Sequence, residues 1–330
     1  MTAVSMPEAS SARVPFAEAR RRLAEARFLL VDIALAQEDA NRPDDVAEPE
    51  PESLAAALGL GTEEMSWFGR MEEPVRADLV GGLLCLVVPV VHGERVDHVH
   101  ALANDRFLVT AHRGPAFLAE RIMGHLKRER PKDSVAVFFL MLQEALATFR
   151  QAAVTALLEV EELEDDMFQQ RRPEQVYRLA QLRRRSALLH HSLLPYVHVV
   201  DEVITRRLMG PDFPPERQRL AREFQQAARL VLTAIESLQD AARRAFASYS
   251  SLVAGEQNGV INRLAIVSVI FLPLSFLSGF FGMNFTFLTD KLETRDDFWF
   301  LAVGLQTAVL FGSLYVLHRT RVWRRLRDED

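Results

Sequence analysis

Leu264 to Met283 reads LAIVSVIFLPLSFLSGFFGM and contains no ionisable side chain. A helix needs about 20 apolar residues to cross the hydrocarbon core of a bilayer, which is about 30 Å thick. We therefore predict a transmembrane helix over 264–283. A second uncharged stretch of spanning length, Phe298 to Leu317, follows a polar segment. Together they predict a membrane hairpin with an outer loop at 285–297.

One face of the first predicted span consists mainly of small and polar residues. Steps of three and four residues return to the same face of a helix, and here they give Asn258, Ile261, Ala265, Ser268, Leu272, Ser275, Gly279 and Gly282. Small residues let transmembrane helices approach closely, so this face predicts a helix-packing seam. It also suits a pore wall, which one two-span chain cannot enclose without further copies of itself. The two interpretations are compatible.

The first span ends in Gly282-Met283-Asn284, within FFGMNF. This tripeptide follows a span that contains Pro273, and a second span and a short basic tail come after it. In this setting the sequence resembles the CorA family of divalent-cation transporters. The resemblance covers the C-terminal part by motif and spacing and the rest by architecture. Two departures are Phe281, where the family usually has Tyr, and the loop 286–297, TFLTDKLETRDD, which replaces the usual Met-Pro-Glu-Leu.

The resemblance implies a homopentamer in which the first spans surround a pore. Gly282, Met283 and Asn284 would form the selectivity filter, with a ring of Asn284 amides at the outer mouth. Because Mg²⁺ gives up its water reluctantly, a neutral ring that hydrogen-bonds to the hydrated ion suits it. The implied pore lining, starting at the cytosolic end, is Asn258, Ile261, Leu264, Ala265, Ser268, Leu272, Ser275 and Gly279.

The implied function is channel-like passage of divalent cations, above all Mg²⁺, with Co²⁺ or Ni²⁺ as further ions. Inward movement of a divalent cation through about 100 mV releases about 4.6 kcal/mol, and the sequence has no P-loop for ATP. We expect no enzymatic activity, and no cofactor other than Mg²⁺ as the transported and regulatory ion. Two alternatives are a ZntB-like zinc transporter and a membrane-tethered scaffold of the same fold that does not transport.

Family members close when cytosolic metal binds acidic sites between subunits. The resemblance places such a ligand at Glu223, with Glu94 or Asp97 as its partner in a neighbouring subunit. The match is incomplete, because Gln226 and Ala227 stand where relatives often carry Asp and His. An ordinary surface carboxylate is an equally good interpretation of Glu223. The alternating pair His98 and His100 has metal-ligand spacing on a strand, but a structural use is favoured.

Charge predicts the orientation in the membrane and the kinds of partner. Basic residues flank both spans on one side, at Arg243, Arg244, Arg263 and 319–327, whereas the loop 285–297 is acidic. The positive-inside rule then places both termini in the cytoplasm and the protein in the plasma (inner) membrane. A net charge of −6 argues against nucleic-acid binding. The expected partners are further copies of the chain, the lipid bilayer and divalent metal ions. The N-terminus shows no signal-peptide pattern, and the single Cys85 is expected to be buried.

We predict an α+β fold with membrane helices. The predicted parts are a cytosolic α/β domain over 1–130, a cytosolic helical domain and stalk over 131–262, a two-helix transmembrane domain over 263–318, and a basic cytosolic tail over 319–330. Apolar and β-branched runs predict strands at 26–34, 76–80, 83–91, 99–103 and 106–111. Helix patterns predict helices at 17–24, 53–60, 115–128, 134–169 and 173–208, and a further helix from Pro215 that continues into the first span.

The helix from Pro215 carries apolar residues in strict alternation of four and three, the period of a left-handed coiled coil. This seam consists of Phe224, Ala228, Val231, Ile235, Leu238, Ala242, Ala245, Tyr249 and Leu252. The seam predicts that helices associate along it. At 1.5 Å per residue, a continuous helix from Pro215 to Met283 would be roughly 100 Å long.

Overall fold

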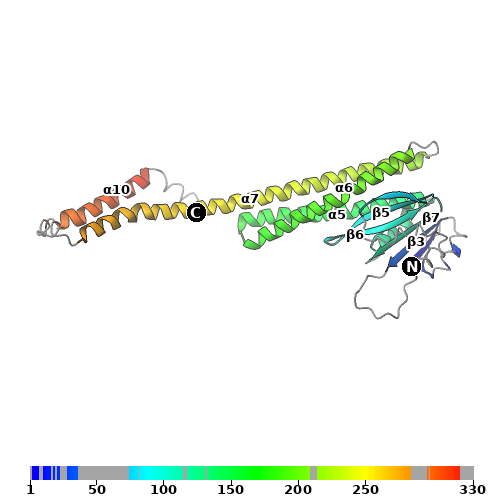
Figure 1. Cartoon of the computed structure of the whole chain (residues 1–330), viewed down its shortest axis with the longest axis horizontal. Helices are drawn as coiled ribbons and strands as arrows, with labels where there is room; N and C mark the ends of the chain where they lie inside the picture. Colours follow the sequence, from blue (N-terminus) through cyan, green and yellow to red (C-terminus); the bar gives the residue numbers. More distant parts are fainter. Residues whose placement is uncertain are drawn as a thin grey trace. The chain divides into compact units, whose positions relative to one another are not determined.

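The structure is a computed structural model of the whole chain (Figure 1). It describes residues 2–6, 10–15, 18, 21–22, 28–35, 74–80, 82–113, 117–129, 131, 133–208, 214–283, 296 and 298–319. The chain divides into two compact units, Met1–Phe246 and Ala247–Asp330. The predicted helix at 53–60, Asn284, most of the loop 285–297 and the tail beyond Arg319 lie outside the described residues.

A seven-stranded sheet forms the centre of the first unit, in the order β2-β1-β3-β7-β6-β5-β4. Neighbouring strands are antiparallel except β3 and β7, which are parallel. The strands are β1 Thr2–Met6, β2 Ser10–Arg13, β3 Phe28–Leu35, β4 Ala77–Val80, β5 Leu83–His92, β6 Arg95–Ala103 and β7 Phe107–Arg113. All five predicted strands are confirmed.

The first two strands were missed by the sequence analysis. β2 reads SSAR and β1 reads TAVSM, and both are short and poor in the β-branched and aromatic residues that mark strands. β1 pairs with β3, where Thr2 lies opposite Asp32 and Met6 opposite Phe28, and β2 pairs with β1. This is long-range pairing that local propensity does not report.

α5 Ser134–Gln169 packs against the sheet of the first unit and buries a long apolar face there. A buried cluster of strand side chains, including Leu29, Val31, Val87 and Leu102, forms a core of the sheet itself. Figure 1 shows α5 beside β5 and β6, and the Val91 amide donates to Thr148 Oγ1 of α5 at 3.0 Å. The expected buried thiol is confirmed, because Cys85 of β5 is fully buried and free.

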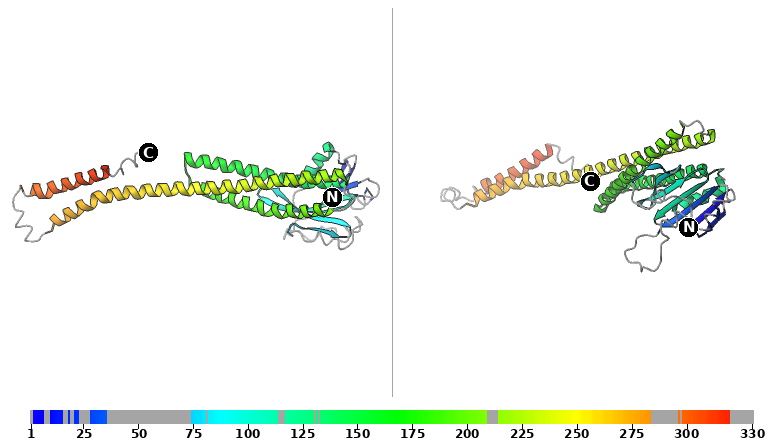
Figure 2. Two further views of the ribbon diagram at one scale, coloured as in Figure 1. Left: turned by 90° about the horizontal axis from the view of Figure 1, so that it is seen from above. Right: turned by 45° about the vertical axis from the view of Figure 1, so that its right-hand side comes forward.

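Three long helices complete the first unit. α5 and α6 Pro173–Leu208 have the predicted bounds, and α7 runs from Pro215 to Phe281. Asp133 supplies the N-cap of α5, because its side chain accepts from the Ala136 amide at 2.7 Å. The predicted helix at 115–128 is α4 Phe117–Glu129. Figure 2 shows α5, α6 and the first half of α7 side by side within this unit.

The predicted seam of α7 packs within its own chain along most of its length. Its first members, from Phe224 to Ala245, are buried inside a single chain. Phe224 meets Tyr196 of α6 in a T-shaped contact with ring centroids 6.1 Å apart, and the Tyr196 hydroxyl donates to the Leu142 carbonyl of α5 at 3.3 Å. This part of the seam therefore joins α7 to the chain's own helices. Only Tyr249 and Leu252, both half-buried, lie beyond it.

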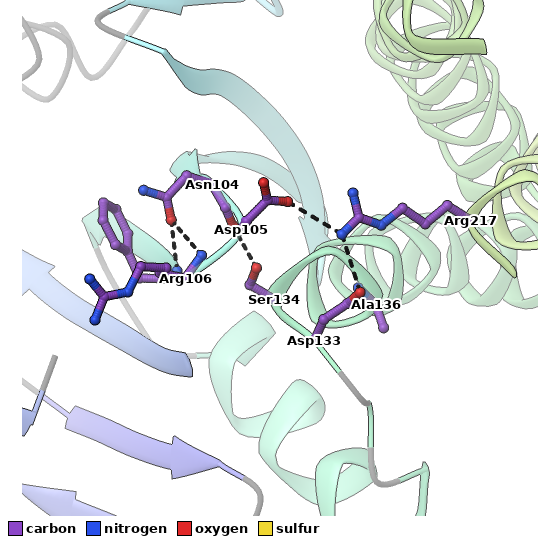
Figure 3. A network of polar contacts seen from close by, with 8 residues as sticks. Asn104, Asp105, Arg106, Asp133, Ser134, Ala136 and Arg217 are labelled. Carbon is purple, nitrogen blue, oxygen red and sulfur yellow. Dashed lines mark hydrogen bonds and ion pairs between the residues drawn. The ribbon is translucent and has the colours of Figure 1, made fainter. Parts of the chain in front are cut away.

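A polar network connects the β6–β7 turn to the starts of α5 and α7 (Figure 3). Asn104 Oδ1 accepts from the amides of Arg106 and Phe107, each at 2.8 Å. Arg217 of α7 reaches Asp105 Oδ1 and Asp133 Oδ2, both at 3.3 Å. The guanidinium thus holds the first turn of α7 next to the α5 cap.

The second unit contains the rest of α7, the π-helix η2 Phe298–Gly304 and α10 Leu305–Arg319. The second predicted span is thus a π-helical turn followed by a shorter α-helix. Among the described residues, α5 and α7 are long and apolar enough to cross a membrane. The apolar window of α5 is mostly buried in the first unit, whereas that of α7 is not buried at all. By length and composition, α7 is the candidate membrane helix.

Candidate ion pathway

The small and polar face of α7 is left uncovered by its own chain. All eight residues of the expected pore lining are exposed, and Leu272 is 74% accessible. The half-buried side chains of this segment lie on another face, at Ile266, Ile270, Pro273, Leu274, Leu277 and Phe281. The lining face is therefore free to meet other molecules, as are Phe271 and Phe276, which are also exposed.

Two residues of α7 show how the helix satisfies its polar groups in an apolar stretch. Ser268 Oγ donates to the Leu264 carbonyl at 2.9 Å, one turn back along its own helix. Such back-bonding satisfies a hydroxyl where water is scarce. Pro273 lacks an amide hydrogen, so one bond of the helix ladder is missing there. A structural role for Pro273 remains the favoured interpretation.

The helix ends in a tight turn at the expected filter. The Gly282 amide donates to the Ser278 carbonyl at 3.0 Å, and the Met283 amide donates to the Phe280 carbonyl at 3.3 Å. A Cβ atom on Gly282 would lie 3.1 Å from the Ser278 oxygen, closer than ordinary contact. Glycine is favoured here because the backbone approaches itself. Asn284 lies outside the described residues, so its filter role stays a prediction.

The expected regulatory carboxylates are far from forming a metal site in one chain. Glu223 makes an ion pair with Arg219, Oε1 to Nε at 3.2 Å, on the exposed side of α7. Glu94 lies exposed at the β5–β6 turn, and Asp97 is half-buried on β6. Among the residues that the structure describes, no three His, Cys, Asp or Glu side chains gather closely enough to hold a metal. The assignment between subunits stays a prediction.

The histidine pair on β6 has surroundings that suit a structural use. His100 is fully buried. Burial lowers the pKa of His98, and the nearby Asp97 carboxylate opposes that effect. Both features fit a structural use, and the lowered pKa favours the neutral form of His98.

A buried polar group on β3 and β7 escaped the sequence analysis. Asp32 is 6% exposed, accepts from Thr110 Oγ1 at 2.7 Å, and lies 3.2 Å from His112 Nε2. The parallel register of β3 and β7 places Asp32 opposite Thr110. The sequence of an apolar strand that contains one carboxylate does not indicate which residues bind that carboxylate, because the partners depend on how the strands pair. The group joins the two parallel strands.

A second pair that escaped the sequence analysis lies in the second unit. Gln306 Nε2 of α10 donates to Ser278 Oγ of α7 at 3.1 Å. It is a side-chain hydrogen bond between the two predicted spans, one turn before Gly282.

Comparison with known proteins covers nearly the whole chain. A family model described as "CorA-like Mg2+ transporter protein" matches residues 43–319. The structure of the CorA magnesium transporter from Methanocaldococcus jannaschii superposes with a TM-score of 0.77 at 16% identity, over 96% of this chain and 97% of the other. The cytoplasmic domain of ZntB from Vibrio parahaemolyticus superposes with a TM-score of 0.59 at 8% identity, over 77% and 98%. At these identities the likeness concerns the fold.

Sequence relatives match over shorter lengths. The cobalt/magnesium transport protein CorA of Thermotoga maritima is 26% identical over 132 residues, which are 40% of this chain and 37% of the other. A putative metal ion transporter of Bacillus subtilis, YfjQ, is 36% identical over 80 residues, 24% of each chain. The matches thus span well under half of these relatives.

Proposed function

The chain belongs to the CorA-like Mg²⁺ transporter family, and from this membership we propose that it passes divalent cations across a membrane. Mg²⁺ is the proposed main substrate, with Co²⁺ and Ni²⁺ as further ions. Proteins named for magnesium or cobalt transport are among its relatives. The observation that carries the proposal is the family match over 43–319, which includes all of α7 and the Gly282-Met283-Asn284 motif.

The proposed pathway is a pore along the uncovered face of α7. Five copies of the chain would place this face around a common axis, with Asn284 at the outer mouth and Asn258 at the cytosolic end. Leu272, Leu264 and Ile261 would form the apolar constrictions, which can close a pore by excluding water. Support comes from the exposure of all these described side chains on α7.

The proposed location is the plasma (inner) membrane, with both termini in the cytoplasm. α7 crosses it as the first span, and η2 with α10 crosses it as the second. The first unit is the cytosolic part, and the membrane potential drives the cations inward. The basic residues before 264 and after 317 support this orientation.

Metal uptake into proteoliposomes tests the function. The purified full-length protein is reconstituted with an inside-negative potential, and entry of Mg²⁺, Co²⁺, Ni²⁺ and Zn²⁺ is followed with dyes in the lumen. We expect Mg²⁺ entry that collapses with the potential and is absent from empty vesicles. Zinc flux that requires a proton gradient would instead support the ZntB-like zinc transporter. Absence of all flux from an intact oligomer would instead support the scaffold that does not transport.

A further inference from the structure

One hydrogen bond ties the second span to the turn that ends the first. Gln306 Nε2 donates to Ser278 Oγ at 3.1 Å. Both residues belong to the second unit, where α10 runs alongside the end of α7 in all views (Figures 1 and 2). Gln306 lies on the less exposed face of α10 with Leu310, Ser313 and Leu317. Its amide reaches across to α7 at the exposed Ser278.

Ser278 connects that bond to the filter turn. Its hydroxyl accepts from Gln306, and its carbonyl accepts from the Gly282 amide at 3.0 Å. The next amide, of Met283, donates to the Phe280 carbonyl at 3.3 Å. A shift of Gln306 therefore acts on the residue whose backbone holds Gly282.

The surroundings of this hydrogen bond allow it to fix the position of one helix relative to the other. The residues adjacent to Ser278 and Gln306 on their helices are mostly apolar, including Leu274, Leu277 and Leu310, and the bond itself is exposed on the single chain. In an apolar medium, a carboxamide without a partner is costly, so polar side chains bond across transmembrane helices. Apolar side chains can slide past one another, but a hydrogen bond fixes one register.

The π-helical start of the second span accounts for the position of Gln306. η2 ends at Gly304, two residues before Gln306. A π-turn accommodates more residues per turn than an α-turn, so it rotates all later side chains about the helix axis. Short π segments are frequent at functional sites. Here the segment precedes Gln306, whose side chain bonds to α7.

We propose that Gln306 and Ser278 are positioning residues for the ion filter: their hydrogen bond fixes the second span against the first and thereby holds the turn at Gly282 and Met283. This inference rests on the proposed transport function. Neither side chain belongs to the expected pore-lining face, so neither is expected to touch the ion.

Flux measurements test the pair by a double-mutant cycle. We expect Gln306→Leu and Ser278→Ala each to lower the initial rate of Mg²⁺ entry by about threefold to tenfold, the range that an interhelical hydrogen bond supports. The double variant should be no worse than either single variant, because both remove the same bond. Ser278→Thr keeps a hydroxyl and should retain most of the rate.

Thr307→Val is the matched control in the flux assay. Thr307 is adjacent to Gln306, but its hydroxyl donates to the Val303 carbonyl of its own helix at 2.8 Å. The rate should stay at the wild-type level. Wild-type rates in Gln306→Leu and Ser278→Ala, or losses that add in the double variant, would overturn the proposal.

A labelling experiment measures the accessibility of position 283 in the turn and does not depend on transport. Met283 is 38% exposed, and Met283→Cys introduces a thiol that a polar maleimide can reach in nanodiscs, where both faces are accessible. The only native cysteine, Cys85, is buried. We expect Gln306→Leu and Ser278→Ala to change the labelling rate at least about threefold, and Thr307→Val to leave it unchanged. Equal rates in all variants would overturn the positioning role. Altered labelling in a protein that transports nothing would contradict the transport function alone.

Discussion

In the proposed pore, Asn284 would select a strongly hydrated cation with an uncharged side chain. A carboxylate ring would bind Mg²⁺ tightly and slow its release, whereas amide oxygens accept hydrogen bonds from the water shell that Mg²⁺ keeps. Selection of the hydrated ion also requires that each amide lie at a fixed distance from the pore axis. In this proposal the turn before Asn284, held by the backbone bonds of Gly282 and Met283, would supply that restraint.

The first prediction concerns the amide itself. We expect Asn284→Ala to lower Mg²⁺ flux at least about a hundredfold, the loss typical when a preorganised polar contact is removed. The oligomer should stay intact, as judged by its elution volume. The control is Thr286→Ala, in the same loop but outside the motif, which should transport normally. Unaltered flux through Asn284→Ala would remove the filter assignment.

The second prediction concerns the glycine before it. A Cβ on Gly282 would lie 3.1 Å from the Ser278 oxygen, so Gly282→Ala must shift the turn. Overpacking of this kind costs about 1–3 kcal/mol, which predicts a flux loss of about tenfold if the filter bears the shift. At Gly312 of α10, a Cβ would meet nothing within 4 Å. Gly312→Ala should therefore leave the Mg²⁺ flux unchanged in the same assay. Equal flux losses in both variants would contradict the geometric explanation.

A third prediction at this scale concerns pH. Burial lowers the pKa of His98 in the folded protein, so the unfolded chain binds a proton more readily. The free energy of unfolding should then fall as pH drops through the ordinary histidine value of about 6.5. Thermal unfolding of the full chain in detergent at pH values above and below this value measures the effect. His98→Gln should flatten the profile, whereas His191→Gln, at an exposed site on α6, should not.

At the scale of elements, α7 shows that a heptad pattern specifies a buried stripe and not its partner. The alternation from Phe224 to Ala245 predicts a packed seam, which is confirmed, and α6 of the same chain contacts it through Tyr196. The sequence contained a hint, since a chain with three successive long helices can satisfy such a stripe internally. Sequence spacing cannot distinguish the two arrangements, because both bury the same residues.

Burial of the α7 seam within one chain gives a prediction that has its control on the same helix. Leu238 is fully buried and Leu230 is 66% exposed, and both lie in α7. Leu238→Ala should destabilise the protein by about 2–5 kcal/mol through lost contacts and a cavity, while Leu230→Ala should stay within about 0.5 kcal/mol of the wild type. Urea unfolding of the detergent-solubilised protein compares them. Similar destabilisation by both substitutions would contradict burial within one chain.

The elements also show which parts of the fold a sequence can predict. The bounds of α5 and α6 follow from Asp133, Pro173 and the segment around Gly210, because capping and turn residues act locally. The strands β1 and β2, the buried group around Asp32 and the bond between Ser278 and Gln306 depend on neighbours far along the chain. For the ion pathway, the periodicity of α7 predicted which face is exposed. It could not predict the hydrogen bond between Gln306 and Ser278 next to the filter turn.

At the scale of the whole molecule, the proposed assembly offers a place for regulation by cytosolic metal. From the family resemblance, we propose that Glu223 of one copy and Glu94 or Asp97 of the next bind regulatory Mg²⁺. Metal held by oxygen ligands from two copies would stabilise their contact. Removal of cytosolic Mg²⁺ should then loosen the assembly and increase the flux.

Substitution of the carboxylate tests this link between copies. Glu223→Gln keeps the size of the side chain and removes its charge, so internal Mg²⁺ should no longer slow the flux or raise the midpoint of oligomer dissociation. The control is Glu216→Gln, at another carboxylate in the first turn of α7, which should keep both responses. Glu223 also pairs with Arg219, and Arg219→Gln separates the two roles: a lost ion pair alone should leave the Mg²⁺ response in place. If Glu223→Gln responds to internal Mg²⁺ like the wild type, Glu223 is a surface carboxylate and metal feedback acts elsewhere.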